Sequence, residues 1–340
     1  MHIVLVTDAW YPQPNGVVRV LGSLKRRLEA RGHRVTVIEP GGFLTTALPT
    51  YAEIRIALLP GRKVARLLEA AGADAIHIAT EGPLGRAARA WCRRRGVPFT
   101  TAYHSKFPEY IHARTRLPLG WLYAAMRAFH APSAAVLAPS PSVARELRGH
   151  GFANVVEWAH GVDTEAFQPA AKDYFDDTGP KAGQRPLWLY VGRVTVEKNL
   201  TAFLDLDLPG RKVVVGSGPQ RDALARRYPE VLFHVADGDV ELRRCFSAGD
   251  VFVFPSRTDT FGLVMLEAMA CGVPVAAFPV TGPLDVLGTR RGEVGVLDDD
   301  LAAAALAARA LDPAACRAHA EGFSWDVVAD EFLSNLAHIG

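Results

Sequence analysis

Residues 250–275 read DVFVFPSRTDTFGLVMLEAMACGVPV, and this stretch decides the fold of the second half of the chain. The apolar run 251–254, stopped by a proline, is typical of a buried parallel strand. A polar loop, 256–260, follows it. Apolar residues then recur at helical spacing until Gly272 and Pro274, which are residues that end helices. The stretch therefore predicts a strand, a loop and a helix.

The start of this helix is expected to bind an anion. Thr260 is placed to cap the helix, so that the following backbone N–H groups point out of the loop beside the carboxyl end of the strand. The helix dipole adds to their attraction for negative charge. The candidate donor-binding positions here are Thr260, Phe261, Gly262 and Leu263.

Two carboxylates flank this anion site. Asp259 comes before the expected helix, and Glu267 lies seven residues after Thr260, or about 10 Å along a helix. A ligand with a diphosphate at the helix start could reach Glu267 with a ribose and present another group to Asp259. A nucleotide sugar has this outline.

The same stretch resembles the signature of glycosyltransferase family 4, whose members are retaining enzymes of the GT-B architecture. The resemblance is carried by two acids separated by seven residues within an FG…LEAMACG frame. It implies that Glu267 holds the ribose hydroxyls and that Asp259 lies beside the donor sugar. The family more often has Glu at the position of Asp259, and the TDTFG form is similar to the lipid-modifying branch of sulfoquinovosyl-, mannosyl- and glucosyl-transferases.

Composition indicates a globular enzyme. The 340 residues are 49% hydrophobic and 22% charged, and no apolar run approaches the roughly 18 residues needed to span a bilayer. The first residues lead directly into a predicted strand without a basic leader, so we expect a cytoplasmic protein. The cysteines show no metal-ligand spacing, so we expect buried thiols. The acidic run 298–300 precedes an Ala-rich helix and is better explained by the helix N-terminus than by a metal.

Strands and helices alternate through both halves of the chain, which predicts an α/β fold with parallel sheets. The expected domains are an acceptor-side Rossmann-like domain at 1–165, a linker at 166–186 and a nucleotide-sugar-binding Rossmann-like domain at 187–322. A helix within 323–340 is expected to cross back to the first domain. The family resemblance implies that the two doubly wound domains face each other across an interdomain cleft. The predicted strands are 2–7, 34–38, 75–78, 99–103, 135–138, 155–158, 187–191, 212–215, 231–235 and 251–254, and the predicted helices include 17–31, 62–71, 84–95, 140–150 and 301–310.

The first domain contributes two candidate site residues, each following a predicted strand. Gly16 ends the loop 8–16, where a missing side chain allows the backbone to approach a ligand. The loop form TD…P…NGV is also similar to the start of the lipid-modifying branch. His104 follows the strand 99–103. A lone histidine is more often structural, but the resemblance implies that His104 faces the donor sugar without acting as a general base.

A second group of candidates follows the strand 187–191. Gly192 ends this strand, and Arg193 and Lys198 place two cations five residues apart behind it. Such cations can clamp a diphosphate from one side while the helix start binds it from the other. The family resemblance assigns the same role to these two positions. The base-facing loop 236–239 leaves UDP and GDP open as the donor nucleotide.

The sequence thus predicts a retaining, metal-independent hexosyltransferase that needs no cofactor besides its UDP-sugar or GDP-sugar donor. A dehydrogenase would need G-x-G-x-x-G after the first strand, and none stands there. A transferase acting on a soluble or polysaccharide acceptor, an inactive transferase-derived binding protein and a nonhydrolysing sugar-nucleotide epimerase remain as alternatives.

Charge asymmetry predicts the acceptor. Residues 1–165 hold 21 Lys and Arg against 12 Asp and Glu, a net +9, whereas the remainder has 17 against 24, a net −7. Basic clusters lie near the apolar residues Leu117, Leu119, Trp121, Leu122 and Tyr123. Arginine beside exposed apolar residues favours an anionic membrane surface. We therefore expect peripheral attachment to the inner face of the cell membrane, a lipid acceptor such as diacylglycerol, and no nucleic-acid partner.

Overall fold

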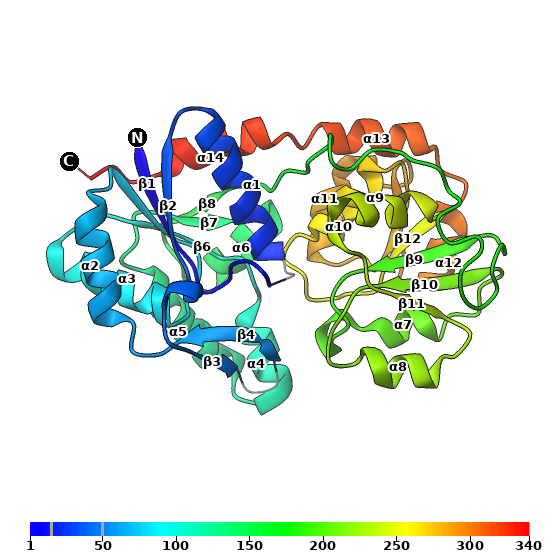
Figure 1. The fold of residues 1–340 in the computed structure, drawn as a ribbon, viewed down its shortest axis with the longest axis horizontal. Helices are drawn as coiled ribbons and strands as arrows, with labels where there is room; N and C mark the ends of the chain where they lie inside the picture. Colours follow the sequence, from blue (N-terminus) through cyan, green and yellow to red (C-terminus); the bar gives the residue numbers. More distant parts are fainter. Residues whose placement is uncertain (14–15, 49–50, 340) are drawn as a thin grey trace. The chain divides into compact units, whose positions relative to one another are not determined.

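The computed structural model describes residues 1–13, 16–48 and 51–339, with side chains described except at 48, 51–54 and 114. Pro14 and Asn15 of the first expected ligand loop therefore lie outside the described residues. The chain divides into two compact units. The first comprises Met1–His160 together with Trp325–Gly340, and the second comprises Gly161–Ser324 (Figure 1).

The first unit is built on a parallel sheet with strand order β2-β1-β5-β6-β7-β8. Its strands are short and mostly buried on both faces, as expected for apolar runs between helices. The bounds are β1 His2–Val6, β2 Arg34–Ile38, β5 Ala75–Ile78, β6 Thr100–Ala102, β7 Val136–Ala138 and β8 Val155–Glu157, with α1 Gly16–Ala30, η1 Pro40–Gly42, α2 Gly61–Ala71, α3 Pro83–Arg95, α4 Phe107–Thr115, α5 Leu119–His130, α6 Pro141–Gly149 and α14 Trp325–Asn335.

This unit has two further features, a local hairpin and a contact with the end of the chain. An antiparallel hairpin, β3 Thr45–Leu48 and β4 Tyr51–Ala57, was not predicted. The C-terminal helix α14 packs on α1, where Arg31 pairs with Asp330 at 2.6 Å and with Asp326 at 3.0 Å (Figure 1). The indole of Trp158 donates a hydrogen bond to the Val328 carbonyl at 3.0 Å. These contacts hold the last helix against the unit formed by the first half of the chain.

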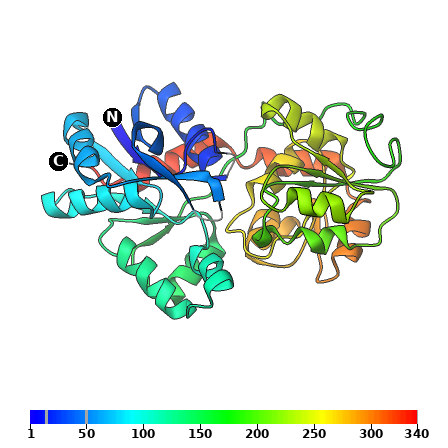
Figure 2. The same cartoon turned by 60° about the horizontal axis from the view of Figure 1, so that its bottom comes forward.

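The second unit also has a parallel sheet, with order β11-β10-β9-β12-β13-β14, and helices on both faces (Figure 2). This is a doubly wound order, in which the order of strand addition reverses between β9 and β12, the first and fourth strands of the unit, while all strands stay parallel. The bounds are β9 Leu187–Val191, β10 Arg211–Val215, β11 Leu232–His234, β12 Val251–Phe254, β13 Val275–Ala277 and β14 Gly295–Leu297, with η2 Val196–Lys198, α7 Leu200–Leu204, α8 Arg221–Arg227, α9 Gly238–Ala248, α10 Leu263–Ala270, α11 Thr281–Leu287, η3 Gly288–Arg290, α12 Leu301–Ala308 and α13 Pro313–Glu321.

The segment expected to be an exposed linker, 166–186, differs from that expectation. Phe167 and Phe175 are 2% and 1% exposed and belong to the core of the second unit. The segment consists of turns rather than a helix or a strand. Single aromatic side chains therefore enter the core, and the sequence shows no repeating apolar face. It is part of the second unit.

Other expectations agree with the structure. The ten predicted strands are present within one or two residues of their expected ends, and the sheets are parallel, which confirms the α/β fold class. All four cysteines are free and buried, and burial raises the pKa of each thiol to about 12. Asp300 accepts hydrogen bonds from the N–H groups of Ala302 and Ala303, so the acidic run caps α12.

Candidate active site

The strand order of the second unit places two loops side by side. β9 and β12 are neighbouring strands, and the strand order of the sheet reverses between them. Ligands of doubly wound sheets bind outside the carboxyl ends of strands at this point. The loop after β9 carries Arg193 and Lys198, and the loop after β12 carries Asp259. Asn199 joins the loops, because its side-chain amide donates to the Pro255 carbonyl at 3.1 Å.

Gly192 begins the first of these loops with φ at +152°, a conformation that side chains rarely adopt. A Cβ there would lie 2.8 Å from the hydroxyl of Tyr190. That hydroxyl is buried and donates to the Arg193 carbonyl at 2.9 Å. Tyr190 was predicted only as a strand residue, but it fixes the backbone that carries Arg193. The Arg193 guanidinium lies 3.4 Å from the Glu197 carboxylate.

Lys198 and Asp259 form an ion pair across the two loops through Nζ and Oδ1. Each side chain is only 16% exposed. Burial by itself raises the pKa of Asp259, but the Lys198 ammonium and the nearby Arg193 guanidinium outweigh it, so that the pKa lies below its ordinary value. Asp259 is therefore held as a carboxylate, and the structure brings together Arg193, Lys198 and Asp259, three of the candidate site residues.

The helix after Asp259 begins later than expected. α10 starts at Leu263, with Gly262 in the N-cap position at φ +89° and no side-chain cap. The prediction that Thr260 caps this helix is wrong, because Thr260 and Phe261 are buried in the loop before it. A left-handed turn at Gly262 redirects the chain, and a Cβ there would lie 2.6 Å from the end of Met265. The start of α10, where the sequence predicted an anion site, therefore lies at Gly262 and Leu263.

Glu267 lies in the middle of α10, and the residue is 8% exposed. The estimate of about 10 Å between Thr260 and Glu267 assumed seven helical residues, whereas only 263–267 of that stretch are helical. The carboxyl end of α10 is fixed by Arg317, which donates to the carbonyls of Ala270 at 2.9 Å and Phe167 at 2.7 Å. Glu267 is therefore carried by a helix that is held at its far end by α13.

The remaining candidates, His104 and Gly16, lie in the first unit. The His104 ring is 5.6 Å from that of His160 and 6.0 Å from that of Trp158. Burial, together with the neighbouring histidine rings, holds the pKa of His104 well below its ordinary value. Gly16 is the first residue of α1, and a Cβ there would meet nothing within 4 Å. The space beside Gly16 is thus open among the described residues.

The described residues contain no group of three or more His, Cys, Asp or Glu side chains arranged to hold a metal. They also contain no helix with the length and apolar character to cross a bilayer.

Comparisons with known proteins cover both units. The model described as Glycosyltransferase Family 4 matches residues 14–166, and that described as Glycosyl transferases group 1 matches residues 185–312. A GDP-mannose-dependent alpha-mannosyltransferase of Corynebacterium glutamicum is 28% identical, covering 100% of this chain and 89% of its own length. Sulfoquinovosyl transferase of Arabidopsis thaliana is 31% identical, covering 73% of this chain and 51% of its own length.

Solved structures show the same fold. Sucrose-phosphate synthase from Thermosynechococcus elongatus superposes with a TM-score of 0.75 at 23% identity over 98% of this chain and 97% of that one. Anabaena HepE, solved in complex with UDP-glucose, gives a TM-score of 0.71 at 15% identity over 99% and 100%. The two Rossmann-like sheets and these neighbours define the GT-B fold. The family matches give the narrower assignment: the chain belongs to glycosyltransferase family 4.

Proposed function

We propose that this protein is a retaining glycosyltransferase that moves a hexose from a nucleoside diphosphate to a hydroxyl of a membrane lipid. The observation that carries this proposal is the cluster of Arg193, Lys198 and Asp259 at the strand-order reversal of the second unit. Two cations there suit a diphosphate leaving group, and an ionised carboxylate beside them suits sugar hydroxyls.

The proposed mechanism depends on position and charge. Arg193, Lys198 and the N–H groups at the start of α10 stabilise the negative charge that grows on the leaving diphosphate. Glu267 holds the ribose and Asp259 holds the donor sugar, so that the anomeric carbon is presented in one orientation. The acceptor attacks the same face from which the diphosphate leaves, and a phosphate oxygen of the donor takes the acceptor proton. Configuration is thereby retained.

For the donor base we propose guanine. The loop after β11 presents Asp237, an exposed carboxylate, and carboxylates accept the N–H groups at positions 1 and 2 of guanine. The loop is fixed, because the Asp237 N–H donates to Glu241 at 2.5 Å and Glu241 contacts His234 at 2.9 Å. The Corynebacterium glutamicum relative is named as GDP-mannose-dependent, which agrees with this choice.

For the acceptor we propose a lipid presented at an anionic membrane. The helices α4 and α5 and the turn between them carry exposed apolar side chains, with Trp121 of α5 72% exposed and Leu117 of the turn 44% exposed. Arg116 lies between the helices and is exposed. Tyr123, which was expected to belong to this surface, is instead buried at 3%. Several basic residues of this unit are ion-paired, including Lys25 with Glu29, so the apolar residues carry more of the argument than net charge.

The test is donor binding followed by transfer. Thermal-shift measurements with GDP-mannose, UDP-glucose, GDP and UDP should show stabilisation by the guanine nucleotides. The protein with its preferred donor is then given diacylglycerol in anionic vesicles, or a soluble glycan, and the anomeric configuration of the product is read by NMR. An α-linked product on the lipid supports the proposal. A β-linked product from an α-linked donor, or transfer only to the soluble glycan, contradicts it.

A further inference from the structure

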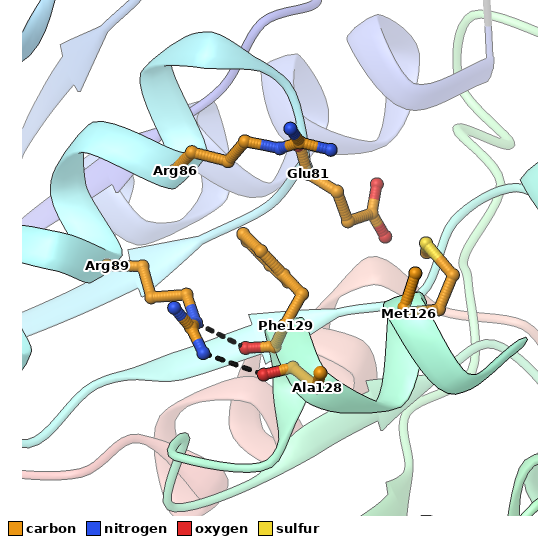
Figure 3. A pocket seen from close by; sticks show the side chains of 7 residues that line it. Glu81, Arg86, Arg89, Met126, Ala128 and Phe129 are labelled. Carbon is orange, nitrogen blue, oxygen red and sulfur yellow. Dashed lines mark hydrogen bonds between the residues drawn. The ribbon is translucent and has the colours of Figure 1, made fainter. Parts of the chain in front are cut away.

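The first unit contains a cavity of about 260 Å³ between α3 and α5, which no part of the transfer mechanism uses (Figure 3). It lies beside the loop after β5, and β5 neighbours β1 at the point where the strand order of this sheet reverses. Glu81 from this loop and Arg86 from α3 supply its polar wall, and Met126 and Phe129 of α5 supply an apolar wall. The cavity is slightly smaller than the roughly 300–1,000 Å³ of pockets for drug-sized ligands, so it suits a single ring.

The cavity is held in shape by hydrogen bonds between its two helices. Arg89 of α3 donates from Nε to the Phe129 carbonyl and from Nη2 to the Ala128 carbonyl, both at 2.6 Å (Figure 3). Its guanidinium also lies 5.5 Å from the centre of the Phe129 ring. The accepting carbonyls lie in the last turn of α5, where carbonyls lack intrahelical partners. The two walls are therefore positioned before any ligand arrives.

The polar wall offers acceptor and donor groups together. The Glu81 side chain is 10% exposed, and one of its oxygens lies 3.2 Å from Nε2 of His130. Figure 3 shows the Glu81 carboxylate directed into the space beside Met126. Arg86 is exposed, and its Nε donates to the Glu81 carbonyl at 3.1 Å. A ligand can thus meet a carboxylate and a guanidinium at one end and an aromatic and thioether surface at the other.

We propose that this cavity binds a neutral hexopyranose unit, forming a carbohydrate site separate from the donor site of the second unit. Sugar hydroxyls both donate and accept, so they satisfy Glu81 and Arg86 together, and the C–H face of the ring packs on Phe129 and Met126. A phosphate would face the Glu81 carboxylate, and an ammonium group would face two guanidinium groups. A purely apolar ligand would make no polar contact with either Glu81 or Arg86. The inference does not depend on which sugar or acceptor the transfer reaction uses.

The experiment is saturation-transfer NMR of the full chain with methyl α-mannopyranoside and methyl α-glucopyranoside. Ala125→Trp places a large side chain at the lining of the cavity, and Glu81→Ala removes its acceptor. The matched control is Ala124→Trp, which adds the same side chain to the neighbouring exposed position outside the lining. Lys198→Ala tests whether the signal comes from the donor site instead.

We expect saturable binding that weakens at least about tenfold in Ala125→Trp and Glu81→Ala, as loss of a charge-assisted hydrogen bond would give. Ala124→Trp and Lys198→Ala should bind as the unmodified chain does. Because Ala125 is exposed, its variant remains informative if removal of Glu81 disturbs folding. Equal binding in Ala125→Trp and the unmodified chain, loss of binding in Lys198→Ala, or no saturable binding would overturn the proposal. Competition by inorganic phosphate would also overturn it, because it would show an anion site.

Discussion

The Lys198 ammonium and the Asp259 carboxylate meet across 61 residues of sequence, joining the loop after β9 to the loop after β12. Their side chains are equally shielded from water, and each supplies the charge that makes burial of the other tolerable. The loops that follow β9 and β12 are therefore electrostatically coupled. The following expectations depend on this pair and on the surfaces around it.

The first prediction concerns stability. Lys198→Met and Asp259→Asn should each lower the free energy of unfolding by about 2–3 kcal/mol, because each leaves a shielded charge without its partner. The double variant should lose less than the sum. The depressed pKa of Asp259 means that its contribution is present above about pH 4 and is lost as pH falls through the native pKa. Urea unfolding from pH 3 to 7 measures this. Strict additivity of the two losses at pH 7 would show that the side chains do not interact.

Asp259→Asn should also separate turnover from nucleotide affinity. The proposed partner of Asp259 is the donor sugar, so kcat should fall by at least about tenfold while the Kd for free GDP stays within about twofold. Steady-state kinetics and calorimetry give the two values. An equal weakening of GDP binding would place the carboxylate beside the nucleotide instead.

Glu267→Gln should weaken donor binding by about 10- to 100-fold, because a charge-assisted hydrogen bond to ribose is replaced by a neutral one. The amide has nearly the same shape, so the Tm should change little. Glu293→Gln, at a carboxylate that is 59% exposed, is the matched control. Unchanged donor affinity in the Glu267 variant would rule out the ribose assignment.

Chelation should leave transfer unaffected. In the proposed mechanism, Arg193 and Lys198 supply the positive charge that many transferases obtain from a divalent cation. Activity is measured before and after dialysis against EDTA, with the Tm followed in parallel to detect unfolding. Activity that disappears and returns with Mn²⁺ or Mg²⁺ would contradict metal independence.

Membrane attachment should depend on Trp121. Flotation with anionic vesicles at low salt should carry the unmodified chain upward and release it at high salt, since charge attraction is screened. Trp121→Ala should reduce the floated fraction several-fold, because a large apolar side chain no longer enters the interface. Val327→Ala, at a residue of α14 that is 56% exposed, is the control. If both variants float as well as the unmodified chain, α5 is not the attachment surface.

Much of the fold could be read from the sequence because its signals are local. Short β-branched runs, helical spacing and glycine or proline at element ends predicted the strands, including 187–191 and 251–254, with small errors at their ends. Arg193, Lys198 and Asp259 are charged residues in the segments that follow those two strands, and this position made them candidates. The hairpin of β3 and β4 was missed, although residues 53–56 alternate charged and apolar side chains, a pattern typical of a strand.

The errors arose where a residue's role depends on the backbone conformation or the packing around it. Threonine commonly caps helices, but the left-handed turn at Gly262 moves the start of α10 beyond Thr260. Phe167 and Phe175 stand in a stretch without periodicity, yet the sheet of the second unit buries them. Tyr123 was expected at the surface, but its ring stacks on that of His150 and it belongs to a buried cluster with Tyr103 and Val155.

The sequence by itself determined which segments become strands and helices, and which charged residues follow the strands. Those properties are set within a few residues by backbone sterics and apolar periodicity. The tertiary structure alone decided that β9 and β12 are neighbours, that Lys198 therefore meets Asp259, and that Glu81 and Phe129 enclose one cavity. Strand order and helix packing are selected by the burial of whole elements against each other, a free energy that no local stretch of sequence contains.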